Sequence, residues 1–350
     1  MKTHRIGIVG YGMIAEFHVA AVSALPNAEL VGIMDRGSGR GAQIAPNVDQ
    51  RDSDNLRAFI SRSDIDVVMI ATPSGAHLDA ALIAAEQGKH CLVEKPIEIT
   101  VERIDQMIAA HSAAGTKLGG IFNTRYTAGA QLLKRTVESA RFGTLTYASA
   151  VGPWWRDAQY YSSSGWKGTW ALDGGGALMN QGIHSVDLLQ WLMGIRVSRV
   201  SGRVATLAHA IEVEDTATAT LEFANGALGH VASTTSMWPG HFRTLTIAGT
   251  DGTAVLADGN LLFWQFREAD EQDDAVAQSI LQLPAAGVGA SNPSAGVDAQ
   301  GHTQVLKRFL QSIDNDSVPE IDGYEARKSV AIIRAVYASS RQNGASVELA

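Results

Sequence analysis

The chain has 350 residues, of which 45% are hydrophobic and 18% charged, an ordinary composition for a globular protein with room for two domains. Its formal net charge of −8 argues against a nucleic-acid partner. Cys91 is the single cysteine, which excludes an internal disulfide and favours a reducing compartment. Because no apolar run is long enough to span a bilayer and no signal-peptide pattern precedes the first strand, we expect a cytoplasmic protein without a membrane partner.

The chain begins with an apolar strand, Arg5–Val9, that leads directly into a glycine-rich turn and a helix predicted to run to about Leu25. The turn has the pattern G-x-G-x-x-A and consists of Gly10, Tyr11, Gly12, Met13, Ile14 and Ala15. Glycines permit a tight turn with close backbone approach to a pyrophosphate, and a helix N-terminus offers free N–H groups to phosphates. An ordinary glycine-rich turn is the alternative, but the preceding strand and the following helix favour a dinucleotide site.

The second predicted strand, Glu29–Met34, ends at an acidic residue, Asp35. A carboxylate at this strand end would accept hydrogen bonds from the ribose hydroxyls of NAD and repel the 2′-phosphate of NADP. Arg36 follows directly and could accommodate that phosphate, so NAD is predicted and NADP stays possible. The alternative is an aspartate that only ends a strand at a turn.

Another buried strand, Val67–Ala71, also ends at polar residues. Thr72, Pro73 and Ser74 terminate it, and His77 lies in the first turn of the helix that follows. Strands that alternate with helices predict an α/β fold with a doubly wound parallel sheet. In such a sheet, ligands bind beyond the carboxyl ends of the strands. These residues are therefore candidates to flank a bound dinucleotide.

A short apolar run after Gly88 has the length and composition of an interior strand, and it stops at a charged pair, Glu94 and Lys95. Pro96 has no N–H to donate, so the strand cannot continue through it. The pair is therefore expected at the mouth of the ligand crevice.

An aromatic and polar segment follows a predicted strand at Leu145–Val151. It contains Trp154, Trp155, Arg156, Tyr160, Tyr161, Trp166, Lys167 and Trp170. Aromatic residues dominate cores and interfaces, so packing is one explanation of this segment. The other is a stacking and hydrogen-bonding wall for a sugar ring. The sequence leaves both alternatives open, and they can apply to different residues of the segment.

Gly174, Gly175 and Gly176 precede a helix predicted from about Leu178 to Met193. This helix places three polar residues, Asn180, His184 and Asp187, at i, i+4 and i+7 on one face. A lone histidine on a helix is more often structural, but three polar groups on one stripe favour a site. His and Asp could also ligate zinc or iron, yet Asn is a poor zinc ligand and no second cluster is evident, so we expect no metal.

From Val197 the pattern changes to consecutive strands. Asn225-Gly226 and Asp251-Gly252 are hairpin turns, which imply a large, mostly antiparallel sheet with an open face. Such a face is a natural interface for a homodimer or homotetramer. Pro284–Gly301 is rich in small and polar residues and reads as a mobile loop, and two helices close the chain.

Several of these motifs together resemble the Gfo/Idh/MocA oxidoreductases. The motifs are Gly10 to Ala15, Thr72-Pro73 with His77, Glu94-Lys95-Pro96, Asn123 with Arg125, and Gly174-Gly175-Gly176 with His184 and Asp187. The resemblance implies an N-terminal Rossmann domain over residues 1–123 and a C-terminal α+β domain with an open sheet over residues 124–350. It also implies hydride transfer between a nicotinamide and a hydroxyl of a sugar or cyclitol, and the segment from Gly174 to Leu192 resembles the branch that acts on nucleotide-sugars and glycosides.

The resemblance also implies roles for individual residues. Cofactor contacts are expected from the glycine turn and from Asp35, Arg36, Thr72, Pro73, Ser74, His77, Glu94, Lys95, Asn123, Trp166 and Lys167. Substrate contacts are expected from Lys95, Arg125, Arg156, Tyr160, Asn180 and His184. Several members carry an aspartate four residues before the histidine, whereas this chain has Asn180, which cannot take up a proton.

Lys95 and His184 are the expected catalytic pair. A lysine ammonium can stabilise a developing alkoxide, and an imidazole has a near-neutral pKa suited to taking the hydroxyl proton. One alternative is a dinucleotide-binding regulator without turnover. Another is a sugar transhydrogenase that never releases its cofactor.

Overall fold

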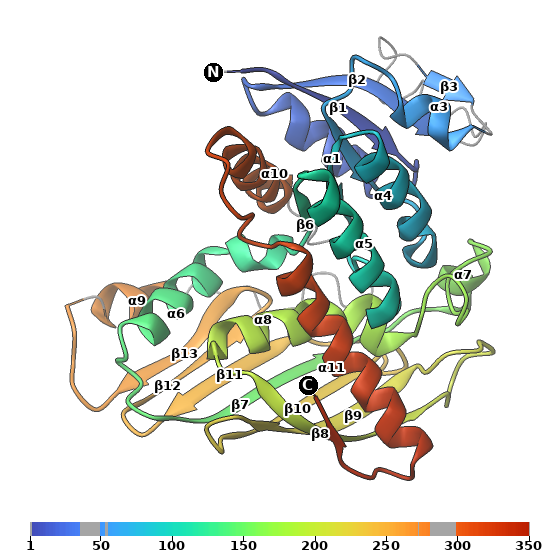
Figure 1. The fold of residues 1–350 in the computed structure, drawn as a ribbon. Helices are drawn as coiled ribbons and strands as arrows, with labels where there is room; N and C mark the ends of the chain where they lie inside the picture. Colours follow the sequence, from blue (N-terminus) through green and yellow to red (C-terminus); the bar gives the residue numbers. More distant parts are fainter. Residues whose placement is uncertain (1, 36–49, 53–54, 272, 281–298, 350) are drawn as a thin grey trace. The chain divides into compact units, whose positions relative to one another are not determined.

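The computed structural model describes residues 2–35, 50–52, 55–271, 273–280 and 299–349 (Figure 1). It divides into two compact units. Unit 1 comprises Met1–Asn123 and Asp298–Arg327, and unit 2 comprises Thr124–Val297 and Lys328–Ala350. The two units are described separately below.

Unit 1 is built on a six-stranded, all-parallel sheet with the strand order β3-β2-β1-β4-β5-β6. The strands are β1 His4–Val9, β2 Ala28–Asp35, β3 Gln50–Asp52, β4 Val67–Ile70, β5 His90–Val93 and β6 Leu118–Gly120. This order confirms the doubly wound sheet, although β3 was not expected from the sequence. The four side chains of β4 are at most 1% exposed, and burial of each contributes roughly 1.5–3 kcal/mol.

The helices of unit 1 follow the expected alternation. They are α1 Ala15–Ser23, α3 Leu56–Ile60, α4 His77–Glu86, α5 Val101–Ala114 and α10 Ala299–Asp314. α5 shows why its ends could be predicted: the side chain of Thr100 accepts a hydrogen bond from the Arg103 N–H, and Gly115 ends the helix at a positive φ of 65°. A short 3-10 turn, Ser74–Ala76, replaces the expected first turn of α4.

The resemblance implies a second domain that runs unbroken from residue 124 to residue 350. In the structure the chain returns to unit 1 at Asp298–Arg327 before it ends in unit 2. α10 packs against α1, so a segment that follows the excursion of residues 124–297 into unit 2 completes the Rossmann unit. The predicted mobile loop Pro284–Gly301 lies outside the described residues up to position 298, and its last three residues form the start of α10.

Unit 2 is built on an eight-stranded sheet with the order β13-β12-β11-β7-β10-β9-β8-β14. Its strands are β7 Leu145–Pro153, β8 Val197–Ala205, β9 Thr216–Phe223, β10 Leu228–Thr234, β11 Thr244–Gly249, β12 Gly252–Ala257, β13 Asn260–Phe266 and β14 Val347–Glu348. The β7–β10 pairing is parallel and the other pairings are antiparallel, which confirms the mostly antiparallel sheet. Both predicted hairpins, β9–β10 and β11–β12, are present.

Helices cover one face of this sheet, as Figure 1 shows for α8. The helices of unit 2 are α6 Ala128–Glu138, α7 Ala158–Ser162, α8 Ile183–Met193, α9 Asp273–Ile280 and the C-terminal part of α11 Gly323–Arg341. Along β9, buried and exposed side chains alternate strictly, so the opposite face of this strand is open. The outer face also carries Tyr147 and its cross-strand partner Leu228, which are 38% and 58% exposed.

The predicted helix Leu178–Met193 is not a single α-helix. A π-helical segment, Ala177–Gly182, precedes α8. Because a π turn holds more residues than an α turn, Asn180 and His184 do not form the regular i, i+4 pair that the sequence predicted.

Candidate active site

The two glycines of the N-terminal turn have different roles in the local structure. Gly10 has a φ of 98°, and a Cβ there would lie 2.6 Å from the Thr72 nitrogen at the end of β4. At Gly12 a Cβ would meet nothing within 4 Å. Gly10 therefore packs the turn against the neighbouring strand end, and Gly12 leaves open space beside the start of α1.

The N-terminus of α1 is suited to an anion. Ile14 is its N-cap residue and makes no side-chain capping hydrogen bond, so capping side chains do not compete for the first N–H groups. Tyr11 is half-buried and Met13 is 49% exposed on the same turn. The open space at Gly12 and this uncapped helix end together fit the pyrophosphate of a dinucleotide.

The acidic residue expected to read the ribose ends β2, as predicted. Asp35 is the last residue of that strand, but its side chain and the whole of Arg36 lie outside the described residues. The choice between NAD and NADP at this position therefore stays a sequence prediction.

His77 connects the ends of two neighbouring strands. Its Nε2 lies 2.9 Å from the Thr72 carbonyl oxygen, and its Nδ1 lies 3.0 Å from that of Pro96. The ring is 1% exposed, and burial lowers its pKa. His77 was expected to contact the cofactor. In the structure its two ring nitrogens link the loop after β4 to the loop after β5, with Thr72 and Pro73 half-buried beside it and Ser74 buried, and the cofactor contact stays a prediction.

Glu94 lies at the end of β5 between two buried histidines. Its Oε1 is 3.0 Å from Nε2 of His18 in α1 and 3.7 Å from Nε2 of His302 in α10, while its Oε2 accepts the Lys95 N–H at 2.9 Å. Burial alone would raise the pKa of this carboxyl, but the contacts with His18 and His302 outweigh it and hold the pKa well below its ordinary value. Nδ1 of the same His302 lies 3.5 Å from Nδ2 of Asn123.

Lys95 stands out from its neighbours by exposure. It is half-buried, whereas the flanking residues 91–94 and 96–99 are all buried. Cys91, three positions from Glu94, is fully buried, and burial raises the pKa of its thiol, which makes it an inert core residue. At the end of β5, Lys95 is thus the residue that reaches accessible space.

His184 and Asn180 show the same behaviour in unit 2. Residues 173–190 are described completely, and all are buried except these two. The glycines before them serve packing, because a Cβ at Gly175 would lie 2.1 Å from the Tyr337 hydroxyl and one at Gly176 would collide with the Glu214 carbonyl. The stretch is therefore anchored by its backbone and offers two polar side chains.

Asp187 and Arg125 form a buried ion pair that the sequence did not predict. Both are 0% exposed, and the guanidinium binds both carboxylate oxygens, with Nε 2.7 Å from Oδ2. The guanidinium also lies 5.2 Å from the Trp191 ring. This geometry shows that Arg125 and Asp187 hold each other in the interior, so Asp187 leaves the predicted polar stripe, and the substrate contact of Arg125 stays a prediction.

Two buried carboxylates next to the glycines were missed from the sequence. Asp173 accepts the Asn180 amide at 2.6 Å and the Gly168 N–H at 2.9 Å. Glu214 accepts the N–H groups of Gly176 and Leu178 and the Tyr337 hydroxyl, each at 2.9 Å. Burial raises the pKa of Glu214 to about 7 against these hydrogen bonds. Asp173 directly precedes the glycine run, which was the available signal.

The aromatic segment divides between packing and accessible positions. Tyr161 is buried and its hydroxyl lies 2.8 Å from Oγ1 of Thr235, while Trp166 and Lys167 are half-buried. Nζ of Lys167 lies 3.9 Å from the ring centroid of Tyr160, whose hydroxyl accepts a hydrogen bond from Gln181 at 2.9 Å. Arg156 is buried, with its guanidinium 4.9 Å from the Trp154 ring and 5.3 Å from that of Tyr160.

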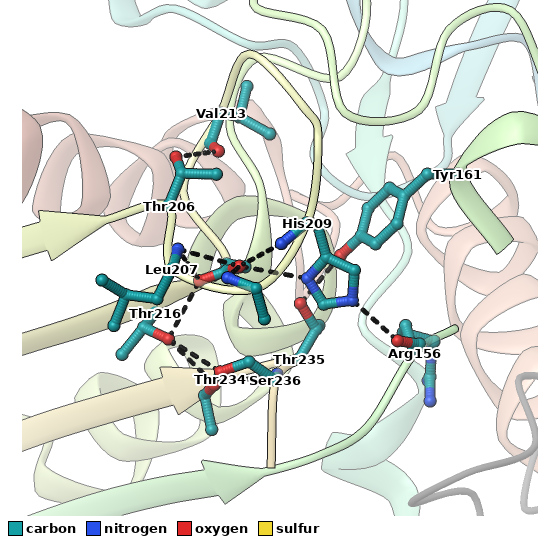
Figure 2. A network of polar contacts seen from close by, with 12 residues as sticks. Arg156, Tyr161, Thr206, Leu207, His209, Val213, Thr216, Thr234, Thr235 and Ser236 are labelled. Carbon is teal, nitrogen blue, oxygen red and sulfur yellow. Dashed lines mark hydrogen bonds and ion pairs between the residues drawn. The ribbon is translucent and has the colours of Figure 1, made fainter. Parts of the chain in front are cut away.

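A second histidine–carboxylate pair holds the loop after β8 (Figure 2). Asp215 is 0% exposed and accepts hydrogen bonds from the backbone N–H groups of Leu207, Ala208 and His209. It also faces Nδ1 of His209 at 3.0 Å, whose Nε2 lies 2.8 Å from the Arg156 carbonyl oxygen. Burial would raise the pKa of Asp215, but these donors hold it below its ordinary value.

Two kinds of feature are absent from the described residues. No group of three or more His, Cys, Asp or Glu side chains there is arranged to hold a metal ion. Within the same residues, no helix combines the length and apolar character required to cross a membrane.

The doubly wound sheet and the glycine turn define a Rossmann domain of the kind that binds a dinucleotide. Residues 4–120 match the model of the oxidoreductase family with an NAD-binding Rossmann fold, and residues 130–255 match that of the GFO/IDH/MocA C-terminal domain. The WlbA dehydrogenase from Bordetella pertussis, solved in complex with NADH and UDP-GlcNAcA, is 31% identical. The match covers 100% of this chain and 98% of that one, with a TM-score of 0.88. The chain belongs to the Gfo/Idh/MocA family of oxidoreductases.

Two other comparisons agree with this assignment. Inositol 2-dehydrogenase 3 of Saccharopolyspora erythraea is 29% identical over 339 residues, which are 90% of this chain and 95% of that protein. A levoglucosan dehydrogenase, solved in complex with NADH and levoglucosan, shares the fold with a TM-score of 0.83 at 23% identity, covering 99% of each chain.

Proposed function

We propose that this protein transfers hydride between NAD and a secondary hydroxyl of a sugar, a sugar derivative or a cyclitol. The names of the similar proteins support this substrate class, since they act on or bind an inositol, levoglucosan or a nucleotide-linked sugar. The observation that carries the catalytic assignment is exposure. Lys95 is half-buried in a stretch that is otherwise buried, residues 91–99. His184 is half-buried in residues 173–190, where Asn180 is the other residue that is not buried.

In this mechanism Lys95 donates a hydrogen bond to the reacting oxygen, and its positive charge stabilises the alkoxide that develops there. His184 takes the hydroxyl proton as general base. When bound, NAD supplies the carbon that accepts the hydride. Glu94 fixes the backbone of Lys95 through the hydrogen bond to its N–H. Gly10, Gly12 and the start of α1 would hold the pyrophosphate of NAD.

A nucleotide-linked sugar is the first substrate to test. The likeness to the WlbA dehydrogenase spans the whole chain, and that structure contains UDP-GlcNAcA. The half-buried residues Trp166, Lys167 and Tyr160 would form one wall of the sugar site, with Arg156 behind Tyr160.

The test is NADH absorbance after adding NAD with UDP-GlcNAcA, myo-inositol, scyllo-inositol or levoglucosan. On the substrate that responds, Lys95→Met should lower kcat by about 10³-fold or more and His184→Ala by about 10²–10⁴-fold. Lys307→Met and His241→Ala change exposed residues of the same types and serve as matched controls. Near-normal turnover in Lys95→Met would refute the assignment.

Two outcomes would favour the other possibilities. A wild type that binds NADH but turns over none of the sugars or cyclitols would support a non-catalytic regulator. Cofactor retained through purification would support a transhydrogenase.

The oligomer is proposed to form through the open face of the unit 2 sheet, where Tyr147 and Leu228 are exposed. Light scattering tests this interface: we expect a homodimer or homotetramer for the wild type and a smaller species for Leu228→Glu.

A further inference from the structure

Asn180 is held by a carboxylate that is hidden from solvent. Its Nδ2 lies 2.6 Å from Oδ1 of Asp173, and Asp173 is 1% exposed. The other carboxylate oxygen, Oδ2, accepts the Gly168 N–H at 2.9 Å. Asn180 itself is half-buried, so one end of its amide is fixed in the interior while the side chain still reaches accessible space.

The chemistry of this contact decides which end of the amide is turned inward. An ionised carboxylate only accepts hydrogen bonds, whereas an amide has an NH₂ donor at one end and an oxygen acceptor at the other. Asn180 must therefore present its NH₂ to Asp173, which directs Oδ1 away from it. Hydrogen bonds to a charged partner are roughly twice as strong as neutral ones, so this orientation is well enforced.

We propose that Asp173 is a positioning residue that fixes Asn180 as a hydrogen-bond acceptor toward the substrate. The position then selects a substrate hydroxyl that donates a hydrogen bond, next to the hydroxyl that reacts. This inference rests on the proposed function, because it concerns the same sugar or cyclitol site. Asn180 cannot take up a proton, whereas several members of the family carry an aspartate at this position. The proposal gives Asn180 a defined role there.

Substitution of Asp173 alone should invert the polarity of the position. In Asp173→Asn, the new amide can still accept the Gly168 N–H with its oxygen, which turns its NH₂ toward position 180. Asn180 then meets that donor with Oδ1 and turns its own NH₂ toward the substrate. The loop contact with Gly168 is kept in this variant, and the melting temperature checks that the fold is kept as well.

The exchange variant Asp173→Asn/Asn180→Asp provides the rescue. The amide at position 173 accepts the Gly168 N–H and donates to the carboxylate at position 180, so both hydrogen bonds are kept. The group that faces the substrate is again an acceptor. A purely structural role of Asp173 predicts no loss of activity in Asp173→Asn, because both hydrogen bonds are kept there as well.

The first measurement is kcat/KM with whichever of UDP-GlcNAcA, myo-inositol, scyllo-inositol and levoglucosan the wild type oxidises. We expect Asp173→Asn to lower it by about 10–100-fold, with the KM for NAD and the melting temperature nearly unchanged, and the exchange variant to recover at least about tenfold. Wild-type kinetics in Asp173→Asn, or a folded exchange variant that recovers nothing, would overturn the proposal.

The second measurement does not need turnover. In protein labelled with ¹⁵N-asparagine, the side-chain NH₂ signals of Asn180 are assigned by their loss in Asn180→Asp. We expect one of the two protons to be shifted downfield in the wild type and to lose that shift in Asp173→Asn. Signals at the position of a solvent-exposed amide in the wild type would overturn the orientation, whereas failure to oxidise any probe would count against the proposed function alone.

Discussion

Units 1 and 2 each bury carboxylates against cationic or imidazole partners, but the other groups that these carboxylates contact differ between the two units. In unit 1, Glu94 faces two imidazoles with one oxygen and the Lys95 N–H with the other. In unit 2, Asp215 is surrounded by backbone donors of one loop, and Asp187 is paired with a guanidinium that is itself 0% exposed. Burial of a carboxylate does not by itself indicate a functional role; the groups that it contacts do. Among these three carboxylates, Glu94 in unit 1 is the one that contacts a half-buried lysine, Lys95.

The largest expected effect is on the ion pair of unit 2. Arg125→Met leaves Asp187 charged and buried without its guanidinium, which should lower the free energy of unfolding by about 3–5 kcal/mol. Urea denaturation followed by tryptophan fluorescence measures this loss. The double variant Arg125→Met/Asp187→Leu removes both charges and should recover most of the stability; a double variant as unstable as the single one would contradict a purely structural pair.

The next effect concerns Asp215. Asp215→Asn replaces one accepting oxygen by an NH₂ group that faces the N–H groups of the loop, so we expect a loss of about 2–3 kcal/mol in the free energy of unfolding. Because this cluster is assigned to holding the loop, kcat at a temperature where the variant is folded should stay within about twofold of the wild type. A large fall in kcat without a fall in melting temperature would place this cluster with the functional carboxylates.

Glu94→Gln should show the opposite behaviour. Removing the charge between His18 and His302 weakens the fixation of Lys95, and we expect kcat to fall by about 10–100-fold, or about 1.4–2.8 kcal/mol in activation free energy. Binding of NADH, followed by its fluorescence, should change little. If Glu94→Gln lowers stability but leaves kcat unchanged, then Glu94 belongs with Asp215 and the contrast between the two units disappears.

The effect that is smallest near neutral pH is a pH dependence of the free energy of unfolding, which arises from a buried histidine outside these clusters. Burial lowers the pKa of His111 in α5 to about 4, so the folded state keeps it neutral while the unfolded state takes up a proton below about 6.5. Its contribution to stability is complete above pH 6.5 and is lost as the pH falls toward 4, by up to about 3 kcal/mol. Melting temperatures of the wild type and His111→Gln between pH 7 and 4 should converge as the pH falls.

Much of unit 1 could be predicted from the sequence because its signals are local. The cap at Thr100 and the left-handed glycine at position 115 are local signals for the ends of α5, and apolar runs that stop at a polar residue or proline predicted β4 and β5. The hairpin turns of unit 2 were predictable for the same reason, since two residues of fixed backbone preference determine each turn.

The assignments that needed the tertiary structure depend on residues far apart in the chain. The ion pair of Arg125 joins it to a partner 62 positions away, and His77 links the ends of two strands, and neither contact follows from a local pattern. The π-helical segment at Asn180 could not be read from a pattern that assumes an α turn.

The sequence by itself determined the family, the doubly wound sheet, the glycine turn and the short set of polar residues at strand and helix ends, because each of these is encoded within a few neighbouring positions. The tertiary structure decided which of those polar residues are buried and hydrogen-bonded within the fold and which reach accessible space. Burial and hydrogen-bond partners depend on elements such as α10 and α11, which pack against segments more than a hundred residues earlier in the chain, and no local pattern records such contacts.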